Sequence, residues 1–231
     1  ASAFQSCASL AALPDNLDLS QGDKFNDAFY GCTSLATIGT GVLLGTAASN
    51  VNFTSVFRIS GLTALPAGLD MSQGSTFESA FNGCSSLATI GAGVLLGTAS
   101  SNVSFNVAFR SSGLTELPAN LDMSQGSSFQ STFRDCSHLT TIGSGVLLGT
   151  AHGSASVDFE HAFRNSGLTA LPADLDMSKG DVFINTFKEC ASLATIGSGV
   201  LLGTANATAT VNFASAFQSC ASLAALPDNL D

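Results

Sequence analysis

The chain has 231 residues, a formal net charge of −10 and only 10% charged residues. This low charge, with a mean hydropathy of +0.35, excludes a disordered chain. Apolar runs reach only about four residues, which excludes a transmembrane helix. The seven Lys and Arg residues are too few and too scattered for a nucleic-acid surface.

The 17 Phe residues mark an internal repeat. Phe4 stands alone because the chain begins three residues before it, and the other sixteen form pairs spaced i, i+4. The pairs are Phe25 and Phe29, Phe53 and Phe57, Phe77 and Phe81, Phe105 and Phe109, Phe129 and Phe133, Phe159 and Phe163, Phe183 and Phe187, Phe213 and Phe217. Cys or Ser follows each second Phe by three residues, and these positions recur every 24 to 30 residues. Such a period is typical of a solenoid.

The steps of one coil can be read in chain order. The Phe-x3-Phe spacing predicts a single helical turn with both rings on its inward side. The S-L-x-x-I and G-L-T-A-L steps that follow predict a short strand. The V-L-L-G and L-D-M-S steps predict either a second short strand or an extended turn, with Gly and Asp-x-Ser at the corners. All five prolines follow Leu and should mark a strand end or a turn. They are Pro14, Pro66, Pro118, Pro172 and Pro227.

No coil can bury its Phe pair alone. Stacking coils about 4.8 Å apart would line the rings into a continuous spine and pair the strands. The expected fold is therefore a repeat solenoid, leucine-rich-repeat-like, with short parallel strands, short helical turns and loops. We expect about eight to nine coils of 24–30 residues, forming one continuous segment over residues 1–231.

A longer repeat lies above the coil. Residues 1–18 recur without change at 214–231, so residues 1–213 form a super-repeat of 213 residues. The chain starts and ends within a motif and lacks polar capping units. We expect it to be a segment of a longer tandem array, or of an assembly with a period of eight coils, on the order of 40 Å. An engineered or averaged sequence is the alternative.

The repeated stretches AFYGCTSLATI, AFNGCSSLATI, TFRDCSHLTTI and TFKECASLATI, with LDMSQGSTFESAF and its two sister copies, resemble the BspA-type leucine-rich repeats of bacterial surface proteins. The resemblance covers nearly the whole chain. It implies a right-handed solenoid and a role as an adhesin, a host-binding surface or a phage or bacterial fibre. No Asn stands at the ladder position and Phe replaces several Leu, so a straight or twisted rod is as compatible with the pattern as a horseshoe.

Motifs for catalysis or cofactor binding are absent. No nucleophile elbow, P-loop or zinc-ligand spacing occurs, so we expect no enzyme activity, no cofactor and no bound metal. His138, His152 and His161 are isolated, and no nucleophile recurs near them. The Asp of the L-D-[LM]-S step recurs in every second coil, where closing its own turn is favoured over a calcium column. Its members are Asp18, Asp70, Asp122, Asp176 and Asp231.

All six Cys occupy the same slot of the repeat, alternating with Ser. Stacked slots bring Cα atoms close enough for a disulfide, but parallel Cβ vectors are poorly aimed for one. Buried thiols in a small-residue ladder are therefore favoured. The candidates for a disulfide are the neighbours Cys7–Cys32 and Cys190–Cys220.

The residue after each second Phe should point outward, and five of the seven basic residues gather in this column. They are Arg58, Arg110, Arg134, Arg164 and Lys188. They could contact an acidic surface on a neighbouring solenoid or a glycan, or they could be solvated, with their stems covering the Phe spine. Asn52, Asn102 and Asn206 begin N-x-S/T sequons, which imply glycosylation only in a host that performs it.

The first functional hypothesis is a structural repeat protein, a segment of a long extracellular or virion-associated fibre. The alternatives are a cell-surface adhesin or glycan-binding repeat, and an ice-binding solenoid. Ice binding needs a regular Thr ladder, and the Thr residues of GVLLGTA recur only in alternate coils, at Thr46, Thr98, Thr150 and Thr204. The expected partners are other copies, along or beside the fibre axis, and a surface glycan or protein. We expect no nucleic acid and no membrane insertion, and a location on a cell surface, in a secreted filament or on a virion.

Overall fold

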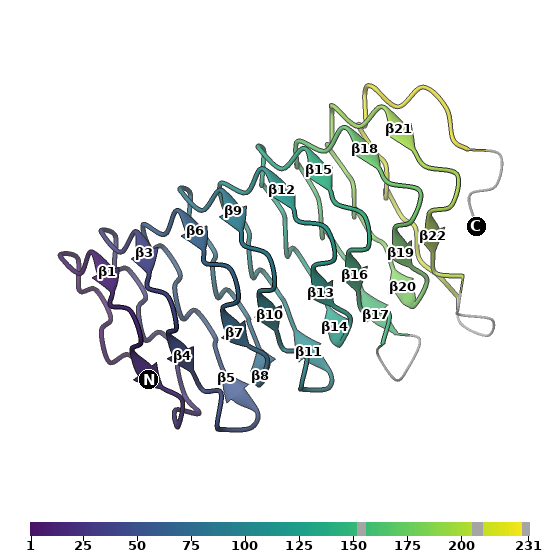
Figure 1. The fold of residues 1–231 in the computed structure, drawn as a ribbon. Helices are drawn as coiled ribbons and strands as arrows, with labels where there is room; N and C mark the ends of the chain where they lie inside the picture. Colours follow the sequence, from purple (N-terminus) through teal and green to yellow (C-terminus); the bar gives the residue numbers. More distant parts are fainter. Residues whose placement is uncertain (152–155, 205–209, 228–231) are drawn as a thin grey trace.

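Successive coils of the chain stack side by side along one axis, with the first and the last described coils at opposite ends (Figure 1). The computed structural model describes residues 1–151, 156–204 and 210–227. Each complete coil contributes one strand to each of three ladders, and all paired strands are parallel. This confirms the predicted solenoid of short parallel strands. Three residues singled out in the sequence, His152, Asn206 and Asp231, lie outside the described ranges.

The first ladder is formed by the S-L-x-x-I and G-L-T-A-L steps, as predicted. Each strand has a buried Leu or Ile at its second position, followed directly by Pro or Gly. Because Pro has no N–H to donate, it ends the strand where the sequence indicated. The strands are β1 (Ala12–Leu13), β3 (Thr37–Ile38), β6 (Ala64–Leu65), β9 (Thr89–Ile90), β12 (Glu116–Leu117), β15 (Thr141–Ile142), β18 (Ala170–Leu171) and β21 (Thr195–Ile196).

The second ladder is formed by the V-L-L-G and L-D-M-S steps, so of the two alternatives the structure has the strand. Its outward positions alternate between Asp and Leu, and most of its inward positions are fully buried Leu or Met. The strands are β2 (Asp18–Leu19), β4 (Leu43–Leu44), β7 (Asp70–Met71), β10 (Leu95–Leu96), β13 (Asp122–Met123), β16 (Leu147–Leu148), β19 (Asp176–Met177) and β22 (Leu201–Leu202).

The third ladder was not anticipated from the sequence. It is one continuous six-stranded sheet that lies just before the Phe segments. The isolated bridges between Lys24 and Asn52 and between Val182 and Asn212 continue it at both ends. The strands are β5 (Val51–Asn52), β8 (Gly74–Thr76), β11 (Val103–Ser104), β14 (Gly126–Ser128), β17 (Val157–Asp158) and β20 (Gly180–Val182).

The helical turn predicted at Phe-x3-Phe is wrong, because no helix occurs in the described ranges. In one such segment, the N–H groups of Phe53, Ser55 and Phe57 donate to carbonyls of the next coil at 2.8–3.0 Å. The N–H groups of Val56 and the alternate residues after it donate three residues back, which closes consecutive β-turns. Ser55, with φ of 52°, is the third residue of the first turn, where a type II turn requires a positive φ. Because the two Phe residues are four positions apart in this run of turns, both rings point inward, as they would in a helix.

The rings form two parallel stacks rather than one spine. The first members of the pairs stack from Phe25 to Phe213, and the second members stack from Phe4 to Phe217. Neighbouring ring centroids lie 4.9–5.8 Å apart, within the range for offset aromatic pairs. Every ring from Phe25 to Phe187 is at most 6% exposed, whereas Phe4 and Phe213 are about half exposed. The stacks are therefore the continuous core of the rod.

The glycine of the S-G-L-T coils lies close to the backbone of the preceding coil. A Cβ at Gly61 would clash with the carbonyl oxygen of Thr33 in the preceding coil, and Gly113 faces Ser85 in the same way. At this step the S-G-L-T coils leave no room for a side chain against the preceding coil. Only glycine permits this approach.

Removing one interior ring should destabilise the whole rod. Phe109 is fully buried between Phe81, at 4.9 Å, and Phe133, at 5.6 Å. We expect Phe109→Ala to lower the free energy of unfolding by about 3–5 kcal/mol. The control is Phe213→Ala, which should cost clearly less because Phe213 is 44% exposed and stacks only on Phe183. Urea titration followed by circular dichroism measures both, and equal losses would contradict the role of stacking.

A second variant should stabilise the chain. Ile59 has a φ of 55°, a conformation that is costly for a β-branched residue, while sister coils have Gly31 and Gly83 at this position. Its side chain is 43% exposed, so little packing is lost on substitution. We expect Ile59→Asn to raise the free energy of unfolding by about 1 kcal/mol. The matched control is Ile184→Asn, at a position without a positive φ, and an equal gain there would contradict the strain argument.

Candidate contact surface

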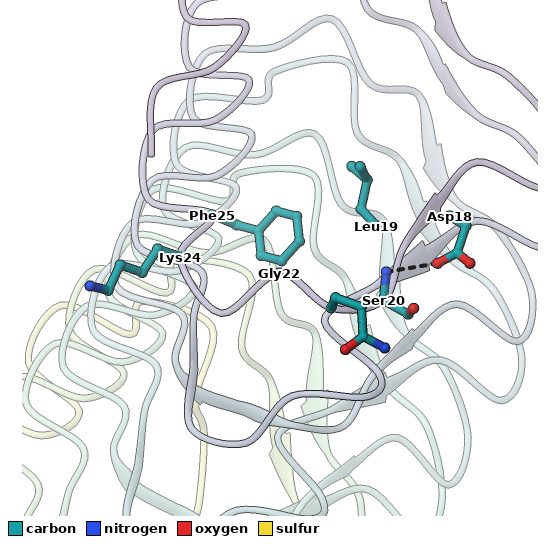
Figure 2. Close-up of a pocket in the computed structure, with 7 residues that line it drawn as sticks. Asp18, Leu19, Ser20, Gly22, Lys24 and Phe25 are labelled. Carbon is teal, nitrogen blue, oxygen red and sulfur yellow. Dashed lines mark hydrogen bonds between the residues drawn. The ribbon is translucent and has the colours of Figure 1, made fainter.

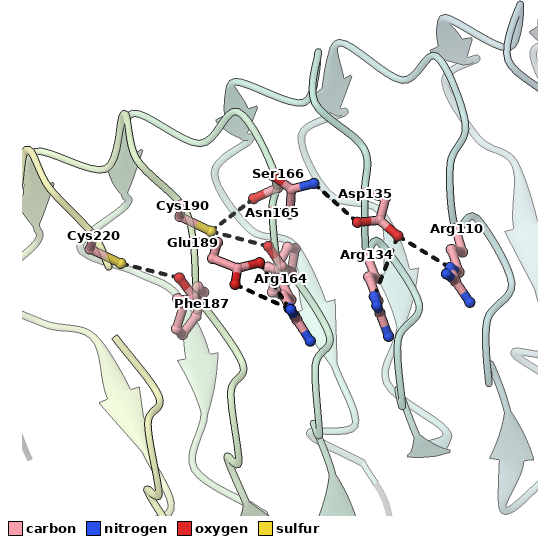
Figure 3. A network of polar contacts seen from close by, with 11 residues as sticks. Arg110, Arg134, Asp135, Arg164, Asn165, Ser166, Phe187, Glu189, Cys190 and Cys220 are labelled. Carbon is pink, nitrogen blue, oxygen red and sulfur yellow. Dashed lines mark hydrogen bonds and ion pairs between the residues drawn. The ribbon is translucent and has the colours of Figure 1, made fainter. Parts of the chain in front are cut away.

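The central arginines of the basic column, Arg110, Arg134 and Arg164, are paired within the chain (Figure 3). Arg110 and Arg134 both approach Asp135, with Nε to Oδ2 distances of 3.3 and 3.4 Å. The amide of Asn165 donates to the other oxygen of Asp135 at 3.1 Å. Asp135 therefore joins side chains from three consecutive coils.

Arg164 and Arg58 also make contacts within the chain. Arg164 binds Glu189 of the next coil through two hydrogen bonds, of 3.0 and 3.2 Å. The hydrogen bond from Arg164 is the main cause that lowers the pKa of Glu189, and the charge of Lys188 contributes. The guanidinium of Arg58 lies 5.5 Å from the ring centroid of Tyr30, a cation–π contact.

These contacts favour the interpretation of the column as a set of links between coils. The paired side chains are 24–40% exposed, so each ion pair should contribute at most about 1 kcal/mol. Sequence reasoning missed the acidic partners. Asp135 and Glu189 occupy the position directly after a column cation, in R-D-C and K-E-C, and that adjacency was the available signal.

All six cysteines are free thiols, so the candidate disulfides Cys7–Cys32 and Cys190–Cys220 are not formed. The thiols donate instead to a backbone carbonyl one coil earlier. Cys32 Sγ bonds to the carbonyl of Phe4 at 3.0 Å, and Cys220 Sγ bonds to that of Phe187 at 3.1 Å. This direction points each sulfur at the backbone and not at the neighbouring sulfur.

The thiols of Cys84, Cys136 and Cys190 each lie beside the Ser that occupies the same repeat slot in the preceding coil. Cys136 Sγ donates to the carbonyl of Phe109 at 3.1 Å and lies 3.3 Å from Ser112 Oγ. Burial raises the pKa of the Cys84 and Cys190 thiols, and it raises that of Cys136 to about 11. These thiols are therefore protonated and poor nucleophiles at neutral pH.

The Asp of the L-D-[LM]-S step closes its own turn, as the local interpretation predicted. Its Oδ1 accepts the N–H of the Ser two residues later at 2.8–2.9 Å, which is an Asx turn. Over the ranges that the structure describes, no three His, Cys, Asp or Glu side chains gather where they could hold a metal ion. The four residues are Asp18, Asp70, Asp122 and Asp176.

His138 and His161 are the histidines, and Asn52 and Asn102 the sequon residues, that the structure describes. His161 Nε2 lies 3.5 Å from Glu160 Oε1, and partial burial lowers the pKa of the imidazole. His138 is exposed. Asn52 is half-buried, with its Oδ1 accepting the N–H of the second residue after it at 2.8 Å, whereas Asn102 is exposed. None of these residues joins a cluster with the others.

The three ladders and two ring stacks define a tandem-repeat β-solenoid protein. No family model and no curated protein matches the chain. Among solved structures, it is similar to a leucine-rich repeat protein from Bacteroides ovatus at 15% identity, over 97% of this chain and 80% of that one, with a TM-score of 0.28. The fold class is shown by the three ladders of parallel strands. Over the described residues, no helix has the length and apolarity needed to span a membrane.

The buried thiols should make stability fall at alkaline pH. Because the folded pKa of Cys136 is about 11 and its ordinary value is 9.0, the neutral thiol stabilises the fold below pH 9. This contribution is lost as the pH rises from 9 to 11, roughly 2 kcal/mol for this thiol. Urea unfolding at pH 8 and pH 11 measures the loss. The matched variant Cys136→Ser copies the sister slot Ser112 and should lose less; an equal loss would contradict the assignment.

Proposed function

We propose that the chain is a non-catalytic structural repeat protein, a segment of a long extracellular or virion-associated fibre. The observation that carries the proposal is the continuity of the third ladder and of the two Phe stacks from one end of the described chain to the other. The hydrogen bonds of the ladders, the ring contacts, and the ion pairs of Arg110 with Asp135 and of Arg164 with Glu189 run from coil to coil, parallel to the axis. Such a rod supplies reach and stiffness without any binding site.

The side chains that could take part in binding or catalysis support the same proposal. Asp135 and Glu189 neutralise column cations, and the buried thiols bond to backbone carbonyls. Each of these groups connects one coil to the next. Buried, protonated thiols are also protected from oxidation, which suits a location outside the cell. That location rests on the resemblance to bacterial surface-protein repeats.

The alternative functions lack an observation of their own. An adhesin that binds acidic partners would present free cations, whereas Arg110, Arg134 and Arg164 are paired within the chain. An ice-binding face would need Thr in every coil. Thr46 and Thr98 recur only in alternate coils and are half-exposed.

The proposal predicts that length grows linearly with the number of super-repeats. Chains built as residues 1–213 followed by 1–231, and as two copies of 1–213 followed by 1–231, should be straight rods under negative-stain electron microscopy. Each added copy should lengthen the rod by about 40 Å, because eight coils stack about 4.8 Å apart. The control carries a flexible Gly/Ser insert at each junction and should bend there. Separate globules without the insert would contradict a continuous rod.

A further inference from the structure

One stretch of sequence occurs at both ends of the rod, and it contacts a different coil at each end. Residues 1–18 lie against the coil of residues 25–47, and residues 214–227 lie against the coil of residues 183–202. Since 214–231 repeats 1–18, one stretch of sequence is built to contact both coils, one on each side. Each copy in this chain uses only one of its two sides.

The contacts of the first copy are well defined. The Phe4 ring stacks on Phe29 at 5.2 Å, and its backbone N–H donates to the carbonyl of Ala28 at 2.8 Å. The Cys32 thiol donates to the carbonyl of Phe4. Strand β1 pairs with β3 in the register Ala12 to Thr37. Every partner here belongs to the coil of residues 25–47.

The second copy carries the donors for the same contacts, but they are unused. Within the described residues, the N–H groups of Ser215, Phe217 and Ser219 have no hydrogen-bond partner. The equivalent groups of Ser2 and Phe4 donate to the following coil at 2.8 Å. The outer side of residues 214–227 therefore has the hydrogen-bonding pattern that fits a coil like 25–47.

The first coil has a matching hollow. A space of about 430 Å³, lined by residues 18–22, Lys24 and Phe25, opens on the side away from the following coil (Figure 2). In the interior of the rod, the corresponding space beside a Phe is filled by the preceding coil. For Asn52 and Phe53, the preceding coil supplies Lys24, which pairs with Asn52, and Phe25, whose ring stacks on Phe53.

The 213-residue period identifies the occupant of this hollow. If copies of residues 1–213 follow one another, the coil before Lys24 and Phe25 is the last coil of the preceding copy. Asn212 and Phe213 of that copy then lie beside Lys24 and Phe25. Phe213 stacks on Phe183 at 5.0 Å with one side of its ring and is 44% exposed. Its open side would continue the first ring stack on Phe25.

We propose that residues 211–227 of one chain dock on the coil of residues 25–47 of a second copy, where they replace that copy's own residues 1–14. This head-to-tail exchange rests on the proposed fibre function and names its joint. Because the exchanged contacts are identical, the exchange itself is nearly neutral, as in domain swapping. Burial of the open side of Phe213 against Phe25 is the added contact, and it favours the joined form.

Cross-linking of the full chain tests the joint. The two thiols outside the buried set, Cys7 and Cys220, are replaced by Ser, which sister coils carry in the same slot. Lys24→Cys and Asn212→Cys are then added, and a short bis-maleimide that reaches only adjacent coils is applied. We expect a denaturing gel to show dimers, trimers and higher multiples of the 23.3 kDa chain.

Two control pairs fix the interpretation. Lys24→Cys with Asn52→Cys places the thiols on neighbouring residues of one chain, so it should cross-link within the monomer and shows that the variants fold. Lys24→Cys with Val182→Cys lies one coil out of register and should give no ladder of multimers. A ladder of equal yield from this second pair would overturn the proposed register.

A chain carrying Lys24→Cys and Asn212→Cys that stays monomeric, while the intramolecular control cross-links, would overturn the exchange. The fibre proposal would survive that result, because rods from covalently joined super-repeats need no exchange between chains. Globules in place of those rods would remove the fibre proposal itself. The two failures are therefore distinguishable.

Discussion

The structure depends on one constraint: a coil of 24–30 residues can neither bury its own Phe rings nor satisfy its own backbone. Each interior ring is covered by the rings of the coils before and after it, as Phe109 is by Phe81 and Phe133. Alternate N–H groups of the Phe segments up to that of Phe183 and Phe187 donate to the next coil. Stability is therefore a property of neighbouring pairs of coils, and a rod of any length repeats the same interface.

That constraint explains why side chains suited to chemistry have structural roles. Asp135 holds Arg110 from the coil before and Asn165 from the coil after. The Cys136 thiol, which could have been a nucleophile, donates to the carbonyl of Phe109. These polar groups at the Phe edge are used between coils. A protein made in this way is suited to carrying load along its axis, which is the basis of the proposed fibre.

Neighbouring coils also impose conformations that the local sequence disfavours. Ile59 and Val107 have φ values of 55° and 58°, although β-branched residues are strained there. Both lie in Phe segments whose hydrogen bonds to the next coil fix the backbone, as the N–H of Ile59 does by donating to Asn82. The contacts between coils thus outweigh a local cost of about 1–2 kcal/mol per residue.

The sequence alone determined the repeat, the strands at the Leu and Ile steps, the prolines at their ends and the inward Phe rings, because period and burial are local patterns. The i, i+4 spacing of Phe25 and Phe29 could not distinguish a helix from consecutive β-turns, since both place the rings on one side. In the third ladder Asn52 lies beside Lys24, 28 positions away, and Arg164 pairs with Glu189, 25 positions away. Only the offset between stacked coils decides such contacts, and that offset exists only in the tertiary structure.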